Sequence, residues 1–421
     1  MVRFAHLSDV HLGAFREKEL RELNILAFER AIGVCLEKRV DFVIVAGDFF
    51  DIALPEMSVV DRAVKKMRQA QEKGIAFYLV YGSHDYSPTE TSIIDVLCSA
   101  GVLVKVSAFE KPLGVEGERA SLKAFRDEKT GVSFVGVSAR ARALEEKDFA
   151  NIDFSNLDAI PNPKIFVFHS AIAEYAPAEL KGFGGGVSIR SLPQGFDYYA
   201  TGHVHLPQII RDDALEGKPL VYPGPLFASD YRDLEELSKK RHGFWICDLK
   251  ENGDSAVERV DLSVCEVEFL QYDASNKNSM VVQQELASLL DSKGLSGKIV
   301  LLKAYGMLQQ GSSHRDIDFS FLREKAFQKG ARVFYLNRNA LGEAEKADFA
   351  PAAASPDAVE EELFKQSLNA LKLSEALKGE SGLVLSRKLL SSLKSEQQAG
   401  ENKADFEQRV VREAKKIFEQ Q

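Results

Sequence analysis

The stretch Val2-Arg3-Phe4-Ala5-His6-Leu7-Ser8-Asp9-Val10-His11 is an apolar, strand-like run that ends in a carboxylate and an imidazole. Similar runs at 42–45, 77–80, 165–168 and 198–201 precede, in turn, Gly47-Asp48-Phe49-Phe50-Asp51, Gly82-Ser83-His84-Asp85, His169 and Gly202-His203-Val204-His205. The ends of successive buried strands converge on one rim of a sheet, where open α/β sheets bind ligands. The pattern therefore predicts a site of carboxylates and imidazoles, as a two-metal hydrolase requires.

The composition is that of an ordinary globular protein of two or three domains. Of its 421 residues, 45% are hydrophobic and 28% are charged, and no window approaches the roughly 18 apolar residues of a membrane span. The chain starts in a strand rather than a secretion signal, and its four cysteines form no CxxC pair, so we expect a protein of the reducing cytoplasm with no membrane association. The formal net charge of −9 argues against a surface coated for nucleic acid, although bound cations could still hold phosphate locally.

The pattern along the chain predicts four segments. Residues 1–262 alternate short β-branched or aromatic runs with amphipathic helices, which predicts an α/β domain of βαβ units with helices on both faces of its sheet. Residues 263–340 predict a small α+β cap, and residues 341–357, poor in apolar bulk, predict a linker. Residues 358–421 predict three short amphipathic helices. Such helices are marginal alone and favour a partner surface, with a self-contained bundle or a frayed C-terminus as the alternative.

The donor types in the motifs point to a transition metal. Imidazoles and carboxylates suit Mn, Fe or Zn, and the motifs contain no thiolate. Each motif alone is weak evidence for a metal site, because a lone buried histidine is more often a hydrogen-bonded core residue than a ligand. Ionisable groups rarely cluster at buried strand ends without a function, so the set favours a metal site over coincidence. Asp48 lies midway in the order of the motifs and could bridge two ions.

Two segments resemble a known family. Phe4-Ala5-His6-Leu7-Ser8-Asp9-Val10-His11-Leu12-Gly13 and Gly195-Phe196-Asp197-Tyr198-Tyr199-Ala200-Thr201-Gly202-His203-Val204-His205 resemble the Mre-eleven/SbcD DNA repair nucleases, which are calcineurin-like metallophosphoesterases. Val221-Tyr222-Pro223-Gly224-Pro225 is similar to a strand-turn of that family, with Pro225 where serine is usual. The resemblance implies a four-layer α/β/β/α metallophosphoesterase core, a small α+β capping domain and a C-terminal helical partner-binding tail.

The resemblance also implies two Mn²⁺ ions per subunit and a role for each motif residue. One ion would be held by Asp9, His11 and His205, and the other by His169 and His203, with Asp48 bridging. Ser83 stands where the family has an asparagine ligand for the second ion. His84 would stabilise the transition-state charge or protonate the leaving oxygen. Asp51 is the candidate for orienting the His84 imidazole, and Asp85 is the alternative for that role.

The implied function is a manganese-dependent DNA nuclease that processes double-strand breaks. It would act as an exonuclease on double-strand ends and as an endonuclease on single strands. The implied partner is an SMC-like, coiled-coil ATPase of the Rad-fifty/SbcC type, bound through residues 358–421, and a homodimer is implied through helices near 57–67 and 93–100. Two alternatives stay open: a metallophosphoesterase acting on nucleotides or phosphoproteins, and a DNA-end tethering scaffold whose catalysis is weakened, which Ser83 motivates.

Overall fold

The computed structural model describes residues 1–87, 91–111, 119–139, 149–177, 186–343, 382, 384–386, 388, 389 and 403–419. The chain divides into two compact units, Met1–Ala344 and Glu345–Gln421. Most of the predicted linker 341–357 and much of the predicted partner-binding region 358–421 lie outside the described residues.

A six-stranded sheet at the start of the first unit carries the first three motifs. Its order is β15-β14-β1-β2-β3-β4. The parallel strands are β1 (Val2–Leu7), β2 (Phe42–Ala46), β3 (Ala76–Val80) and β4 (Val104–Lys105), and the antiparallel strands are β14 (Gly243–Leu249) and β15 (Ser255–Asp261). All five residues of β2 are buried, as its uninterrupted apolar sequence predicts for a parallel strand that is covered on both faces.

A second six-stranded sheet carries the other two motifs, in the order β12-β13-β11-β10-β8-β7. The parallel strands are β8 (Ser133–Val137), β10 (Lys164–Phe168), β11 (Tyr198–Ala200) and β13 (Pro219–Tyr222), with β7 (Phe125–Arg126) and β12 (Gln208–Arg211) antiparallel at the edges. A small sheet, β5-β6-β9, adds Phe109–Lys111, Ala120–Leu122 and Ile152–Asp153.

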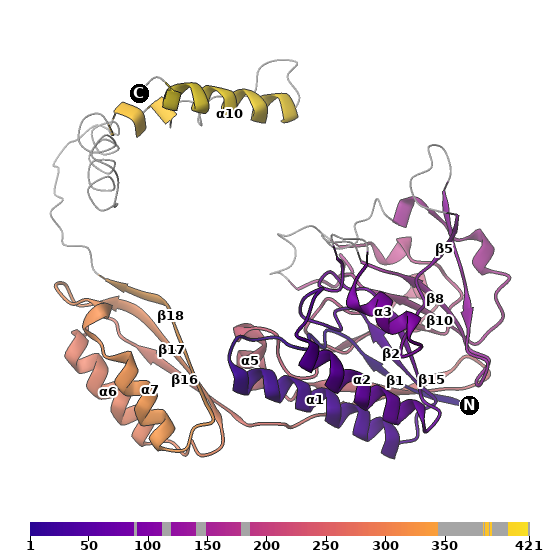
Figure 1. Cartoon of the computed structure of the whole chain (residues 1–421), viewed down its shortest axis with the longest axis horizontal. Helices are drawn as coiled ribbons and strands as arrows, with labels where there is room; N and C mark the ends of the chain where they lie inside the picture. The colour runs from indigo at the N-terminus through magenta and orange to yellow at the C-terminus, as the bar shows by residue number, and fades with distance from the viewer. Residues whose placement is uncertain are drawn as a thin grey trace. The chain divides into compact units, whose positions relative to one another are not determined.

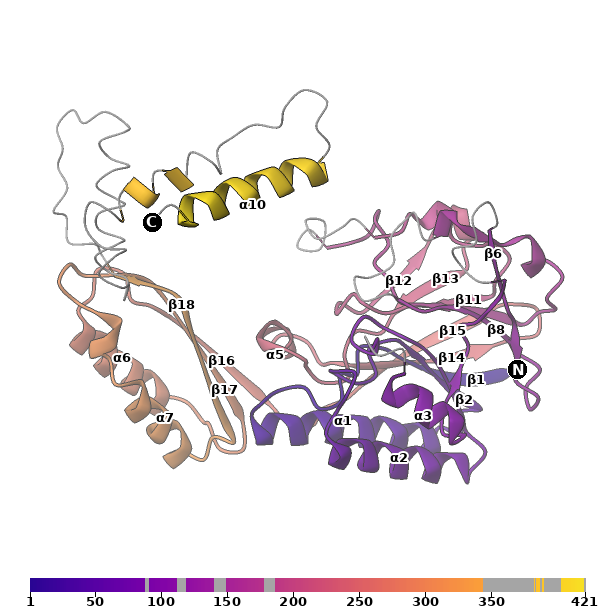
Figure 2. The ribbon, with the colours of Figure 1, turned by 45° about the horizontal axis from the view of Figure 1, so that its top comes forward.

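The two large sheets stack face to face, as Figure 2 shows. The layer between them is rich in aromatic rings. Phe4 and Phe42 of the first sheet stack with ring centroids 5.1 Å apart, and Tyr78 stacks on Phe134 of the second sheet at 4.2 Å. Tyr198 meets Phe4 edge-on at 5.1 Å. This packing brings the carboxyl ends of both sets of parallel strands together, which places the motifs of the two sheets at one site.

Helices cover the outer face of the first sheet (Figure 1). They are α1 (Lys18–Glu37), α2 (Met57–Gln71) and α3 (Ile93–Ser99), and α5 (Tyr231–Leu237) packs Leu234 into the same core. The prediction of helices on both faces of one sheet is wrong here, because the inner face of this sheet packs against the second sheet.

The outer face of the second sheet is covered differently. Within the described part of the chain, it carries loops, the small sheet and three short 3₁₀ turns, η1 (Ser155–Leu157), η2 (Ile189–Ser191) and η3 (Asp213–Leu215). The two large sheets and their helices make a mixed α/β fold, as the sequence predicts.

The helices predicted for a dimer contact bury most of their apolar residues inside the chain. Ile94 and Met67 are fully buried in the core of the first sheet. Met57, at the start of α2, is 62% exposed, and Val96, on α3, is 52% exposed. The apolar residues of these two helices are therefore mainly core, and a homodimer contact through the helices stays a prediction.

A three-stranded parallel sheet with two helices, here called the cap, follows β15. It comprises β16 (Val267–Asp273), α6 (Ser279–Asp291), β17 (Ile299–Leu308), η4 (His314–Asp316), α7 (Phe319–Gln328) and β18 (Val333–Glu343). The two helices lie on one face of the sheet (Figure 1) and bury Leu286, Leu290 and Leu322 against it. Two βαβ units follow one another here, so the order of strands and helices in the sequence is also their order in the cap.

The second unit contains α10 (Lys403–Glu419). It carries apolar residues at helical spacing, each partly exposed: Phe406, Val410, Ala414 and Ile417. Among the helices that the structure describes, none combines the length and the apolar character needed to cross a membrane.

Candidate metal centre

The predicted ligands come directly after parallel strands of both sheets. Asp9 and His11 follow β1, Asp48 follows β2, His169 follows β10 at once, and His203 follows β11. These residues occupy the same end of the stacked sheets, which is the end where ligand sites of α/β folds are built. The sequence pattern of polar residues after apolar runs therefore corresponds to real convergence in space.

Three groups of candidate ligand atoms are closely spaced. Within the described residues, the members of each group present atoms that lie within 4.8 Å of one another. The groups are Asp9/His11/His205, His11/Asp48/His84 and Asp9/Asp48/His169. Asp48 and Asp9 each belong to two groups, as a site for more than one ion requires.

Asp48 is the geometric centre of this arrangement. Its carboxylate is 3% exposed, and its Oδ2 lies 3.2 Å from His169 Nε2 and 3.7 Å from His11 Nε2. Its Oδ1 accepts the backbone N–H of His84 at 2.9 Å. One oxygen of the carboxylate therefore faces two imidazoles, an arrangement that suits a bridging ligand.

Asp9, which follows β1, contacts the loop after β11 that carries His203 and His205. Its Oδ1 accepts the backbone N–H of His203 at 3.0 Å and lies 3.6 Å from His205 Nε2, while its Oδ2 accepts Ser8 Oγ at 2.5 Å. The His203 ring lies 5.3 Å from the His169 ring, centroid to centroid. His203 belongs to none of the three close groups, so its predicted role as a ligand rests on its place beside His169.

Buried imidazole nitrogens show that the site fits a metal. Both ring nitrogens of His11 and Nε2 of His169 are buried and make no well-directed hydrogen bond among the described atoms, and carboxylate oxygens of Asp48 and Asp51 lie 3.2 to 3.7 Å from them. Burying a polar atom without a partner is costly. Together with Asp9 and Asp48, these nitrogens form the imidazole and carboxylate donor set that Mn, Fe and Zn accept.

The electrostatics of the site couple the histidines to the carboxylates. Burial lowers the pKa of His169, but the negative charge of Asp48 outweighs it and raises this pKa to about 9. Burial raises the pKa of Asp48, yet the imidazoles of His169, His11 and His84 leave it below its usual range. Burial and the neighbouring His169 lower the pKa of His203 to about 4. The neighbouring imidazoles, when protonated, stabilise the ionised Asp48 carboxylate. A metal ion that binds His169 must displace a proton from its imidazole.

Strained backbone is concentrated in the candidate ligands. Asp9, His11, Asp48 and His203 adopt positive φ angles of 49°, 45°, 51° and 89°. Non-glycine residues with positive φ are uncommon, and such strain gathers at functional sites where the surrounding structure enforces it. Each of these residues lies just after a strand, and its positive φ changes the direction of the chain there. The side chains can therefore point toward one site.

Two glycines make room for the candidate ligands, because they have no side chain. A Cβ atom on Gly82 would lie 2.1 Å from Asp48 Oδ1, and one on Gly47 would lie 2.2 Å from His169 Nδ1. Gly47 also has a φ of 86°, which a side chain rarely tolerates. The glycines of the second and third motifs are thus required by the close approach of backbone to ligand, and no larger residue fits there.

His84 lies at the exposed side of the centre. Its side chain is 48% exposed, and its ring meets the His11 ring edge-on at 4.7 Å. Its Nδ1 lies 2.7 Å from the backbone carbonyl oxygen of Asp51 and 4.0 Å from the Asp51 carboxylate, whose Oδ1 lies closer to His11 Nδ1, at 3.4 Å. Asp51 therefore contacts His84 mainly through its backbone, whereas the prediction invoked its side chain, and an orienting role stays a prediction.

The structure shows Asp85 in a different place from the one predicted as an alternative. Its carboxylate is 1% exposed and accepts the backbone N–H groups of Phe49, Phe50 and Gly82 at 3.0 to 3.2 Å. It thus fixes the loop after β2 against the loop after β3 rather than the His84 imidazole. The sequence does not distinguish these two roles. An aspartate after a strand could accept backbone N–H groups or contact an imidazole, and the residue type is the same in both cases.

Ser83 lies between Gly82 and His84 in the loop after β3 and is partly exposed. The three close groups contain only imidazole nitrogens and carboxylate oxygens, so the Ser83 hydroxyl is not among them. Its role as a ligand for the second ion stays a prediction.

One residue beside the site, Asp233, lies outside all the sequence motifs. This carboxylate on α5 lies 2.9 Å from Nδ1 of His205. Burial lowers the pKa of His205, but the charge of Asp233 outweighs it and raises this pKa to about 10. Nothing in the spacing of the two residues signals the contact, which arises when α5 packs beside the loop after β11.

Residues 2–207 of this chain match the family described as calcineurin-like phosphoesterase. The chain is similar to the DNA double-strand break repair protein Mre11 of Methanopyrus kandleri, with 28% identity over 290 residues that cover 66% of this chain and 59% of that protein. It is also similar to the protein of the same name from Archaeoglobus fulgidus, with 29% identity over 248 residues that cover 57% of this chain and 53% of that protein.

These comparisons confirm the resemblance that the two motif segments predict. The matched segment spans less than two thirds of the length of either relative. Among solved structures, a dimetal phosphatase from Danio rerio is similar with a TM-score of 0.40 and 14% identity, over 63% of this chain and 97% of that one.

Proposed function

We propose that this protein is a manganese-dependent DNA nuclease that processes double-strand breaks, as an exonuclease on double-strand ends and an endonuclease on single strands. The observation that supports it most is the convergence of imidazoles and carboxylates on Asp48, with buried imidazole nitrogens that make no well-directed hydrogen bond among the described atoms. The similarity to proteins named for DNA double-strand break repair favours DNA over other phosphodiesters.

The chain's own residues divide the work of hydrolysis. When bound, two divalent ions would supply Lewis-acid polarisation of a phosphodiester. Asp9, His11 and His205 would hold one ion, and His169, His203 and Ser83 the other, with Asp48 between them. His84 donates from Nδ1 to the Asp51 carbonyl, so its Nε2 is left to exchange a proton with the leaving oxygen of the substrate.

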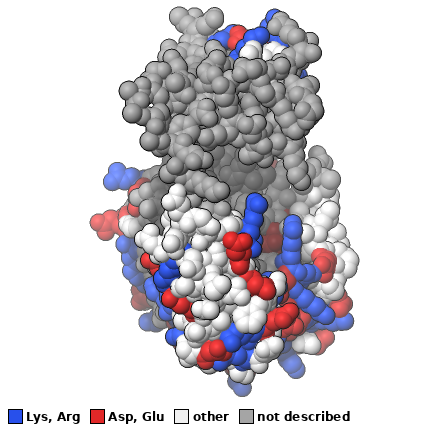
Figure 3. Space-filling view, turned by 90° about the vertical axis from the view of Figure 1, so that its left-hand side faces the viewer, with Lys and Arg blue, Asp and Glu red and all other residues white. Residues whose placement is uncertain are grey.

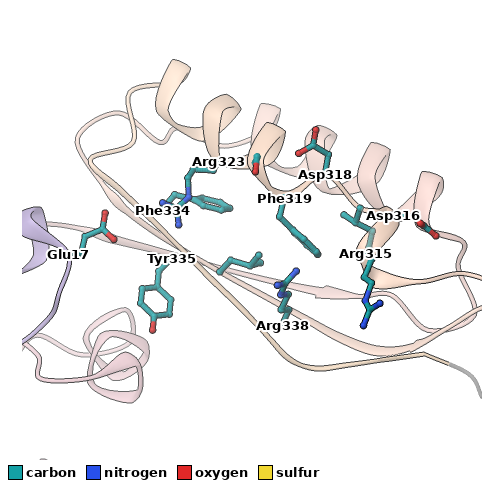
Figure 4. Close-up of a pocket in the computed structure, with 12 residues that line it drawn as sticks. Glu17, Arg315, Asp316, Asp318, Phe319, Arg323, Phe334, Tyr335 and Arg338 are labelled. Atoms are coloured by element: carbon teal, nitrogen blue, oxygen red, sulfur yellow. The ribbon is translucent and has the colours of Figure 1, made fainter. Parts of the chain in front are cut away.

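A hollow at the cap, lined in part by three arginines, supports a polyanionic substrate. The hollow has a volume of about 710 Å³, and the metal candidates do not line it. Arg315, Arg323 and Arg338 line it, and their guanidinium groups form no salt bridge with any residue that the structure describes. The Arg338 guanidinium lies 4.9 Å from the centre of the Phe319 ring, and Figure 4 shows the two side chains facing each other between α7 and β18.

Three acidic residues also line the hollow, and two of them, Asp316 and Asp318, accept backbone N–H groups, while Glu17 is the third. Asp318 accepts the backbone N–H of Phe321 at 2.9 Å as the N-cap of α7, and Asp316 accepts that of Ser313 at 3.3 Å. On the face of the cap seen in Figure 3, basic side chains lie among acidic ones, so that face is mixed in charge. Guanidinium groups bind phosphates, and aromatic rings stack with bases, which together suit a nucleic acid strand.

We also propose that residues 358–421 bind a coiled-coil ATPase of the Rad-fifty/SbcC type. The support is α10, whose Phe406, Val410 and Ala414 are partly exposed. An amphipathic helix of this kind is suited to lie in an apolar groove of another protein.

The substrate class is tested by comparing phosphodiesters and phosphomonoesters with Mn²⁺ present. We expect cleavage of duplex ends and of circular single-stranded DNA, with free nucleotides and phosphopeptides left intact. Turnover of nucleotides or phosphopeptides without DNA cleavage would favour the small-substrate alternative. DNA binding without hydrolysis under any divalent ion would favour the tethering scaffold.

The cap hollow gives a sharper prediction. Replacing Arg315, Arg323 and Arg338 together by glutamine should weaken DNA binding and reduce the salt dependence of binding, by about one unit of log–log slope for each phosphate that is no longer neutralised. Hydrolysis of bis(p-nitrophenyl) phosphate should be unchanged, because that small diester needs only the metal centre. The control is Lys65→Gln, an exposed cation on α2 that pairs with Asp61. Equal losses on DNA and on the small diester would show that the hollow does not bind DNA.

A further inference from the structure

Asp233 is a buried carboxylate to which neither the motifs nor the family resemblance gives a role. It is 5% exposed, and its Oδ1 and Oδ2 lie 2.9 and 3.0 Å from Nδ1 of His205. Its Oδ2 also accepts the backbone N–H and the hydroxyl of Ser229, both at 2.8 Å. The carboxylate is therefore held by one imidazole and one serine.

The helix that carries Asp233 is fixed from two sides. On one side, Leu234 is fully buried in the core of the first sheet. On the other, the Tyr231 ring lies 5.2 Å from the Tyr335 ring of the cap strand β18, and Glu235 pairs with Lys303 of β17 at 3.7 Å. α5 is thus a short helix held between the phosphoesterase core and the cap, and its position sets the position of Asp233.

The far side of the His205 ring faces the metal candidates. Its Nε2 lies 3.6 Å from Asp9 Oδ1, within the close group that also includes His11. An imidazole whose Nδ1–H is held by a carboxylate has a fixed ring orientation and a more basic Nε2, and such outer partners are worth about 10- to 100-fold in metal affinity or activity.

We propose that Asp233 is a positioning residue that holds His205 with Nε2 directed at the ion shared with Asp9 and His11. The inference rests on the proposed function, because it assigns a role toward a divalent ion. Asp233 itself touches neither ion nor substrate and acts only through His205.

The test is Mn²⁺ binding to the metal-free full-length protein, measured by isothermal titration calorimetry. Asp233→Asn keeps the size of the side chain but removes its charge and one of its two acceptor atoms. Its affinity for one of the two ions should fall about 10- to 100-fold, with the other ion unaffected. The melting temperature of each metal-free variant is measured alongside, so that loss of folding is recognised.

Asp230→Ala is the matched control. Asp230 caps the same helix by accepting the backbone N–H of Asp233 at 3.0 Å, and its hydrogen bonds do not reach His205. We expect this variant to bind both ions as the wild type does. Normal Mn²⁺ affinity in Asp233→Asn would overturn the inference, as would equal losses in Asp230→Ala. A wild-type protein that binds no Mn²⁺ would instead contradict the proposed function, and this inference with it.

Discussion

Asp48→Asn should abolish manganese-dependent cleavage and weaken binding of both ions together. The Asp48 carboxylate lies between the imidazoles of His11 and His169, so a neutral amide removes the charge that both ions share. The contribution of a metal to transition-state stabilisation is several kcal/mol, and each 1.36 kcal/mol is a factor of ten in rate. We expect a loss of at least about 10³-fold in kcat/KM, measured on a duplex with a recessed end and accompanied by calorimetric loss of Mn²⁺ binding.

The matched control for this substitution is Asp127→Asn. Asp127 is also a buried carboxylate, 7% exposed, and it accepts hydrogen bonds from Tyr78 and Thr130 in a turn that holds none of the metal candidates. Its loss should cost stability without changing Mn²⁺ affinity. Near-normal cleavage by Asp48→Asn would remove the bridging role from this carboxylate.

His84→Ala should separate chemistry from metal binding. The His84 side chain is half exposed, and its ring is oriented by the Asp51 carbonyl, so it is placed to exchange a proton with substrate. A general acid contributes about 10²- to 10⁴-fold, and a loss of this size in kcat with both ions still bound is the expected result. Calorimetry of the variant with Mn²⁺ and single-turnover cleavage measure the two quantities independently.

Asp51→Asn is the companion to that experiment. This substitution keeps the backbone carbonyl that accepts from His84, so it should cost far less activity than His84→Ala. If the His84→Ala variant instead bound one ion fewer, His84 would be a metal ligand. Its close grouping with His11 and Asp48 supports that alternative.

The strand ends of the site could be predicted because their sequence signal is local. β1, β2, β3 and β10 are short apolar runs that are largely buried, and the polar residues that follow them share one end of the stacked sheets. The antiparallel edge strand β12, in contrast, has partly exposed residues and a weak pattern, so its pairing with β13 could not be predicted.

The finer contacts of the site could not be predicted because they depend on where loops and helices pack. The Asp51 contact to His84 uses a backbone carbonyl, which the identity of the side chain does not encode. The Asp233 contact joins residues 28 apart in the chain through the packing of α5. The role of Asp85 depends on which backbone N–H groups the loop after β2 presents to it.

An anomalous-scattering map from crystals of the full-length protein grown with Mn²⁺ would show directly whether Asp48 bridges two ions. We expect two peaks on either side of the Asp48 carboxylate, about 4 Å apart, one beside Asp9, His11 and His205 and the other beside His169 and His203. A single peak, or peaks that leave Asp48 without a metal neighbour, would show that the two-ion arrangement is wrong.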